Sequence, residues 1–166
     1  MVNKRNIMIV GCLLLAGVSW YLFLFENEET KVKKRFDYIS EKIEKIPGEN
    51  PIVAMANVNR LKEVISETLL INAPAYSISR KINIKDFSSY TLARRFHFKE
   101  ISLKFYDFAI DFPDDITATV TVTARMAGQL KSGDYVEDIH ELQCRLQKKE
   151  DVWRLNELEV VEVLKR

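Results

Sequence analysis

Asp138 and His140 are the residues whose types and spacing could do chemistry. They stand two positions apart in a stretch that alternates polar and apolar residues. A β-strand would therefore place both on one face, roughly 6.6 Å apart along the strand, together with Val136, Leu142 and Cys144. A carboxylate beside an imidazole in a dry pocket could orient a base for proton abstraction. The alternative is that both side chains are solvated, or hydrogen-bonded to loops, at the entrance of the strand.

The sequence offers little other chemistry. It has no glycine-rich phosphate loop, no nucleophile elbow and no metalloprotease helix. Cys12 and Cys144 are far apart, and no Cys/His cluster has metal-ligand spacing, so we expect neither a disulfide nor a metal or cofactor. The net charge of +1 argues against a dedicated nucleic-acid-binding protein.

The N-terminal residues differ sharply in composition from the rest of the chain. Residues 7–25 form a run of 19 residues without a charge, which is long enough to cross the hydrocarbon of a bilayer as a helix. Trp20 and Tyr21 stand near one end of this run, where amphipathic rings favour the membrane interface. We predict a short tail over 1–6, a transmembrane helix in contact with lipid over 7–25 and a domain over 26–166. Without residues 1–25 the net charge falls from +1 to −1.

Two other interpretations of the apolar run are weaker. The apolar region of a cleaved signal peptide usually spans about 7 to 15 residues and is followed by small residues, whereas this run ends in the large residues of 21–25. Lipidation of Cys12 would need a longer apolar stretch before it than residues 7–11.

A count of basic residues would place the domain in the cytoplasm, but long domains translocate largely regardless of charge. We therefore expect the domain outside the cytoplasm.

The first half of the domain predicts helices. An apolar stripe predicts a helix over 27–46 that ends at Pro47-Gly48, and Asn50-Pro51 begins a second helix that runs to about Glu67. Residues 69–84 predict two short strands around Pro74. Asp86 or Ser88 could cap a third helix that runs to about residue 98. The inward residues expected from these helices are Val32, Phe36, Ile39, Ile43 and Ile46 in the first, Ala54, Val58, Leu61 and Ile65 in the second, and Tyr90, Ala93 and Phe96 in the third.

The second half predicts a four-stranded antiparallel meander, over residues 104–112, 116–126, 135–148 and 152–164. In the first strand Tyr106 and Phe108 share the apolar face. In the second, a row of threonines points the other way, formed by Thr117, Thr119, Thr121 and Thr123. The fold class expected is α+β, with helices packed on one side of a curved antiparallel sheet.

This order of elements resembles the nuclear transport factor 2-like superfamily, also called the cystatin-like or SnoaL/ketosteroid-isomerase-like fold. The closing stretch Val152-Trp153-Arg154-Leu155, with residues 159–164, is similar to the terminal strand of that family, and residues 138–142 are similar to the strand before it. The resemblance covers about residues 27–166. It implies a cone-shaped pocket that could take a small apolar ligand, with Tyr90 and Tyr106 able to donate to an oxyanion as tyrosines do in isomerase relatives. Many relatives dimerise through the sheet, which suggests a homodimer or a protein partner on the threonine row.

A membrane helix followed by such a domain is also similar in layout to the inner-membrane assembly component of bacterial type IV secretion systems. The sequence therefore favours a non-enzymatic, membrane-anchored binding or assembly module of a bacterial envelope. Its expected location is the inner membrane, crossed once, with a periplasmic domain. The alternative is a small-molecule isomerase or dehydratase that uses Asp138 and His140.

Overall fold

A computed structural model of the chain describes residues 27–163, except for the side chains of Tyr76, Glu162 and Val163. The predicted tail over 1–6 and the predicted membrane segment over 7–25 lie outside the described residues. Within residues 27–163, no helix has the length and apolar character needed to cross a bilayer. Contacts divide the chain into two units, Met1–Lys31 and Val32–Arg166, and the second unit contains the sheet and its core.

The described residues form three α-helices and six strands. The helices are α2 (Glu28–Ile43), α3 (Pro51–Asn59), which continues into the short 3₁₀ helix η1 (Arg60–Glu63), and α4 (Ile84–Phe96). The strands are β1 (Ile65–Ala73), β2 (Ile78–Asn83), β3 (Phe98–Asp114), β4 (Thr117–Leu130), β5 (Tyr135–Lys149) and β6 (Val152–Val163), and the 3₁₀ turn η2 (Pro74–Tyr76) joins β1 to β2.

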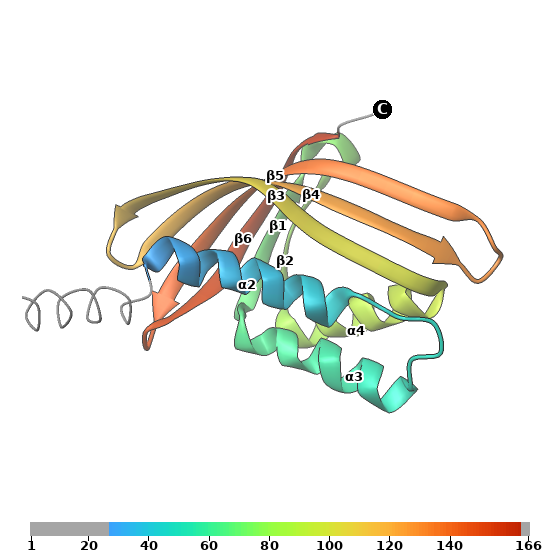
Figure 1. Cartoon of the computed structure of the whole chain (residues 1–166). Helices are drawn as coiled ribbons and strands as arrows, with labels where there is room; N and C mark the ends of the chain where they lie inside the picture. Colours follow the sequence, from blue (N-terminus) through green and yellow to red (C-terminus); the bar gives the residue numbers. More distant parts are fainter. Residues whose placement is uncertain (1–26, 164–166) are drawn as a thin grey trace, which may run out of the picture. The chain divides into compact units, whose positions relative to one another are not determined.

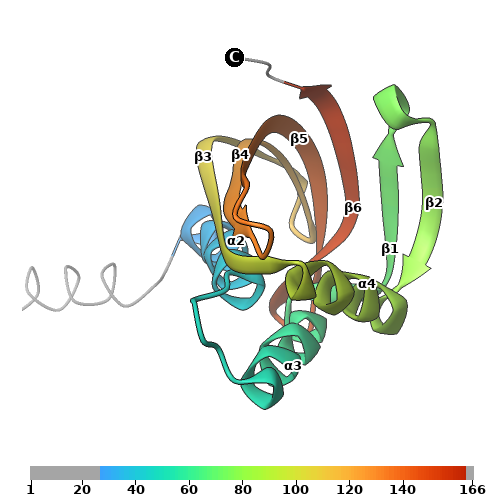
Figure 2. The same cartoon turned by 90° about the vertical axis from the view of Figure 1, so that its right-hand side faces the viewer.

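The strands form one curved sheet in the order β2-β1-β6-β5-β4-β3, and the helices lie on one side of it (Figures 1 and 2). The two short strands predicted within residues 69–84 and the predicted meander are both present, so the α+β class is confirmed. The prediction of an antiparallel sheet is wrong at one place, because β1 pairs with β6 in parallel. Alternation along each strand shows which face is buried, but it does not show which distant strand lies alongside.

The core lies between the helices and the inner face of the sheet. Phe36 of α2 packs edge-on against Phe105 and Phe108 of β3, with ring centroids 5.2 and 5.4 Å apart. Trp153 of β6 and Leu146 of β5 are buried in the same core cluster. The stripe predicted for the first helix is confirmed for Val32, Phe36 and Ile39, which are all buried.

The predicted helices extend too far at their C-terminal ends. Helix α2 ends at Ile43, and Ile46 is 69% exposed, because Lys45 forms an isolated β-bridge with Ile101 instead of continuing the helix. Helix α3 ends at Asn59, so Ile65, which was expected on the second helix, is instead the buried first residue of β1. Tertiary pairing with the sheet overrides the helical period at both places.

The third helix begins earlier than Asp86 or Ser88. Its N-cap is Asn83, whose side-chain Oδ1 accepts a hydrogen bond from the backbone N–H of Asp86 at 2.9 Å. Asp86 is therefore the third residue of the helix, and its carboxylate accepts from Asn83 Nδ2 at 2.6 Å. Reciprocal bonds of this kind satisfy donors at a helix start.

The inward face of α4 also differs from the prediction. Ser88 and Arg95 are its buried residues, whereas Tyr90 and Phe96 are exposed and Ala93 is exposed as well. The prediction is wrong because an arginine near a helix end is ordinarily placed in solvent. Once Arg95 is inside, the tyrosine and phenylalanine on the other side of the helix must face out.

Arg95 is buried because it joins α4 to the segment between α2 and α3. Its Nη2 atom lies 2.9 and 2.8 Å from the two carboxylate oxygens of Glu49 and 2.6 Å from the Glu44 carbonyl oxygen, while Nη1 donates to the Ala54 carbonyl at 3.2 Å. The side chains of Arg95 and Glu49 are 3% and 7% exposed. Water therefore screens this ion pair very little.

Lys45 holds the same segment from the other side. Its Nζ atom donates to the carbonyls of Arg95 and Phe98 at 3.0 and 2.7 Å, and its backbone bonds to Ile101 in both directions. Burial, with the nearby charges of Lys131 and Arg95, lowers the pKa of Lys45 below its usual range. Residues 44–49 are thus fixed at once to the end of α4 and to the start of β3.

Replacing Glu49 by glutamine should destabilise the domain by about 3–5 kcal/mol, because the amide keeps the volume but leaves a buried guanidinium without its counter-charge. Equilibrium unfolding in urea measures this change. Glu137→Gln is the matched control, because it removes a carboxylate from an exposed pair with Arg125 and should leave the unfolding midpoint nearly unchanged. Equal midpoints for the two variants would contradict the role given to the buried pair.

Candidate functional site

Asp138 and His140 lie on β5, on the face of the sheet that the helices cover. They pair with Met126 and Ala124 of β4 and continue the inward row of Leu142. Asp138 is exposed and His140 is half-buried. The Nδ1 atom of His140 is buried and has no hydrogen-bond partner among the described residues. The pair therefore shares the inner face, as the alternation predicts, while its chemical role stays a prediction.

Side chains fill the inner face further along these strands. Phe36, Leu146 and Trp153 are 2%, 0% and 1% exposed. Cys144, two positions beyond Leu142, is also buried, and this burial raises the pKa of its thiol to about 12. Since the thiolate is the reactive form, Cys144 is a packing residue and is not a nucleophile at neutral pH.

Tyr106 lies on the opposite face of the sheet from the pocket that the sequence predicts it to line. In β3, Tyr106 pairs with Thr123 and Ala109 pairs with Thr121, so β3 holds one extra residue, and Asp107 there has a φ of 55°. This bulge reverses the alternation. Phe105 and Phe108 consequently both face inward, and the prediction that Tyr106 shares a face with Phe108 is wrong.

Tyr90 does not line the inner face either. It is 56% exposed on the outer side of α4, and the guanidinium of Arg80 in β2 lies 5.3 Å from its ring centroid. The burial of Arg95 on the other side of the helix is the physical reason. The structure thus keeps Asp138 and His140 on one face, and it separates both tyrosines from them.

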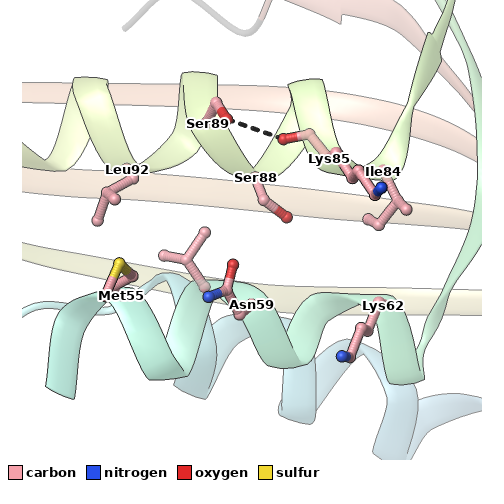
Figure 3. Close-up of a pocket in the computed structure, with 9 residues that line it drawn as sticks. Met55, Asn59, Lys62, Ile84, Lys85, Ser88, Ser89 and Leu92 are labelled. Carbon is pink, nitrogen blue, oxygen red and sulfur yellow. Dashed lines mark hydrogen bonds between the residues drawn. The ribbon is translucent and has the colours of Figure 1, made fainter. Parts of the chain in front are cut away.

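A groove between α3 and α4 is a candidate site that the sequence did not reveal. The two helices run antiparallel along it, so that Met55 faces Leu92 at one end, and Asn59 faces Ser88 in the middle (Figure 3). The groove has a volume of about 420 Å³. Its lining residues are Met55, Val58, Asn59 and Lys62 from α3 and η1, and Ile84, Lys85, Ser88, Ser89 and Leu92 from α4.

The charge of the groove is one-sided. Its lining includes two lysines, Lys62 and Lys85, and no acidic residue. The nearest acids in sequence have other partners. Glu63 accepts from the Tyr38 hydroxyl at 2.6 Å, and Asp86 is held by the cap of α4. Burial, together with the bond to Glu63, raises the pKa of Tyr38 to about 12. The groove is therefore apolar at the Met55 end and basic toward Lys62.

Exposed apolar side chains stand beside the groove on α3. Ile52 is 72% exposed, Val53 is 50% exposed and Met55 is 48% exposed. Only Ala54 and Val58 of this helix are buried. An apolar run over residues 52–56 is a signal that sequence reasoning could have used, because a helix that is apolar on all sides is expected to be covered on all sides.

The threonine row lies on the sheet face that points away from the core. Thr117, Thr119, Thr121 and Thr123 alternate with Ala118, Val120 and Val122, which are fully buried. The alternation predicted for this strand is therefore confirmed. A homodimer or a partner contact through the row stays a prediction. Within residues 27–163, no cluster of three or more His, Cys, Asp or Glu side chains could hold a metal ion.

Comparisons with known proteins identify the fold. No family model matches the sequence. No curated protein matches it either. Among solved structures, the protein Kfla4162 from Kribbella flavida superposes with a TM-score of 0.67 at 12% identity, covering 83% of this chain and 93% of its own.

Two structures of named activity are also similar. The hexachlorocyclohexane dehydrochlorinase LinA-type3 from Novosphingobium barchaimii gives a TM-score of 0.60 at 8% identity, over 82% of this chain and 88% of its own. A scytalone dehydratase-type protein from Novosphingobium aromaticivorans gives 0.59 at 15% identity, over 83% and 85%. At these identities the likeness shows the fold, which is the one that the order of elements suggests, and it assigns no activity.

Proposed function

We propose that this chain, whose domain has the nuclear transport factor 2-like fold, is a membrane-anchored binding or assembly module. The observation that carries the proposal is the α3–α4 groove with the exposed apolar side chains of α3 beside it. Folded domains seldom leave contiguous apolar surface uncovered unless a partner binds there. The buried apolar side chains on the inner face of the sheet are consistent with a partner that binds outside the cone.

The partner that fits this groove is a peptide segment with apolar residues followed by acidic ones. The apolar end of the segment would lie between Met55 and Leu92. Its carboxylates would lie toward Lys62 and Lys85, which no acid of the groove neutralises. Asn59 and Ser88, which face each other in the middle (Figure 3), offer polar contacts that would fix the register of the segment.

The anchor in this proposal is the uncharged run over residues 7–25, which has the length and composition of a membrane span. It would tether the domain to the inner membrane with the domain outside the cytoplasm. Tethering raises the effective concentration of the domain for other membrane-bound partners. A modest affinity of the groove for its partner is then sufficient for the two to associate at the membrane.

The second candidate function is a small-molecule isomerase or dehydratase that uses Asp138 and His140. The buried Nδ1 atom of His140, which has no hydrogen-bond partner among the described residues, favours it. Histidine is the side chain that most often serves as a general base, and His140 lies on the inner face of the sheet. Asp138 on the same face would orient the imidazole or the substrate.

Peptide selection from a random library should enrich segments with apolar residues followed by Asp or Glu. Met55→Asp should weaken the binding of an enriched peptide at least tenfold, because it puts a charge at the apolar end of the groove. Lys62→Glu with Lys85→Glu should reverse the preference toward basic peptides. Titration calorimetry measures both effects.

Tyr135→Asp is the matched control for these variants, because Tyr135 is an exposed apolar residue on β5 that does not line the groove. It should leave peptide affinity unchanged. A selection that enriches no peptide, or peptides that bind Met55→Asp as tightly as the parent, would refute the proposal. A dimer in sedimentation analysis that Met55→Asp dissociates would assign the groove to a second copy of the chain.

The full-length protein should stay with the membrane fraction in alkaline carbonate and be released by detergent, since a spanning helix is held by the hydrocarbon. Deletion of residues 1–25 should release the domain without detergent. Protease added to intact spheroplasts should cut the domain while a cytoplasmic marker survives. A domain that survives together with the marker would reverse the orientation, and release by carbonate alone would refute the anchor.

His140→Asn should leave groove binding, and complementation of a deletion strain, at the level of the parent, because His140 does not line the groove. Asparagine keeps a polar side chain at this half-buried position. Thermal unfolding would verify that the variant is folded. Loss of complementation with intact folding and intact peptide binding would move the assignment to the second candidate.

A further inference from the structure

A second cleft lies on the other face of the sheet, away from the helices. It spans the strands β2, β1, β6 and β5, and has a volume of about 450 Å³. Arg154 of β6 pairs with Gln147 of β5, and the neighbours of Arg154, Trp153 and Leu155, are buried in the core. Because side chains alternate along a strand, Arg154 must point to the face opposite that core.

The cleft exists because β6 is irregular against both of its neighbours at Asn156. The parallel ladder between β1 and β6 runs from Ile65 with Leu155 directly to Leu70 with Glu157, so a four-residue stretch of β1 passes opposite Asn156 alone. The ladder between β5 and β6 also omits Asn156. Such bulges open a sheet and redirect side chains.

Two polar atoms at the cleft are buried and have no hydrogen-bond partner in the described part of the chain. They are Nε of Arg154, which is a donor, and Oδ1 of Asn156, which is an acceptor. Folded proteins pair nearly all buried polar groups, so each such atom needs an explanation. A bound molecule that offers both an acceptor and a donor would pair both atoms once a small rotation of the two side chains opens them to the cleft.

The charge of the cleft indicates which acceptor that molecule carries. Lys81 and Lys149 line the cleft together with Arg154. Two acids, Glu67 and Glu157, also line the cleft. Glu157 lies 3.8 Å from Arg145 and is partly neutralised by that pairing. Positive charge is therefore in excess, which favours an anion.

We propose that this cleft binds a small oxyanion that also carries a hydroxyl group. The oxyanion accepts from Arg154 Nε and lies near the ammonium groups of Lys81 and Lys149. The hydroxyl donates to Asn156 Oδ1. The site is separate from the α3–α4 groove, and its ligand class does not depend on the function proposed for that groove.

Two pairs of probes test the two halves of this proposal. Citrate and tricarballylate have the same three carboxylates, and only citrate has a hydroxyl group. Glycerol 3-phosphate and propyl phosphate both have one phosphate, and only glycerol 3-phosphate has hydroxyl groups. Titration calorimetry on the purified full-length protein should show a Kd of about 1 mM or tighter for at least one hydroxylated probe. Its partner without a hydroxyl should bind at least tenfold more weakly. The pair that binds decides between carboxylate and phosphate.

Variants then assign the contacts. Arg154→Gln should abolish binding, and Asn156→Ala should remove the preference for the hydroxylated probe while leaving weak anion binding. Lys149→Gln, at the exposed rim, should weaken binding and keep the parent's melting temperature, which covers the case in which Arg154→Gln fails to fold. Arg125→Gln is the control, since that arginine lies outside the cleft, and it should bind as the parent does.

Three results would overturn the proposal. One is that none of the four probes binds up to about 10 mM. Another is that the hydroxylated and deoxy probes bind equally to the parent protein. The third is that binding survives both Arg154→Gln and Lys149→Gln unchanged.

Discussion

The buried ion pair between Arg95 and Glu49 is the interaction on which the arrangement of the helices depends. A guanidinium can stay out of water only where an opposite charge and several carbonyl oxygens surround it. Here Glu49 supplies the charge, and the carbonyls of Glu44 and Ala54 complete the shell. Because two of these partners lie in the segment between α2 and α3 and the third lies in α3, one side chain of α4 ties this segment and α3 to it.

The same interaction determines the rotation of α4 about its own axis. With Arg95 inside, Ser88 and Leu92 turn toward α3 and become one wall of the groove. Tyr90 turns outward for the same reason. The groove is thus a consequence of a polar contact made near one end of the helix. Its apolar and basic ends then follow from the residues that happen to stand on the turned face.

The sequence predicted most reliably what depends on local periodicity. The alternation of β4 and the stripe of Val32, Phe36 and Ile39 were correct, because one face of each element is buried along its whole length. Tyr106 was placed on the wrong face because a single extra residue near Asp107 reverses the alternation, and nothing in the residue types marks that bulge. Tyr90 was misplaced because the partner of Arg95 is distant in the sequence.

The candidate sites could not be predicted for a related reason. The groove is made by two helices whose contact depends on Glu49, and the outer cleft is made by a parallel pairing of β1 with β6 that local patterns do not encode. The inner-face pair, Asp138 and His140, stands close together on a regular part of one strand, so its geometry follows from strand spacing alone.

Polar groups that break a local rule mark the places where this domain departs from a purely packed structure. Arg95 breaks the rule that arginines stay in solvent. Glu49 and the carbonyls of Glu44 and Ala54 accept from its two terminal nitrogens, while its Nε atom has no partner among the described residues. Asn156 breaks the pairing of the sheet, and its side-chain oxygen stays without a protein partner among the described residues. The charge of Arg95 is compensated within the chain by Glu49, and Arg95 therefore serves the architecture. The departure at Asn156 is compensated by nothing described in the chain, and this difference is the physical ground for seeking a ligand at the cleft and not at the ion pair.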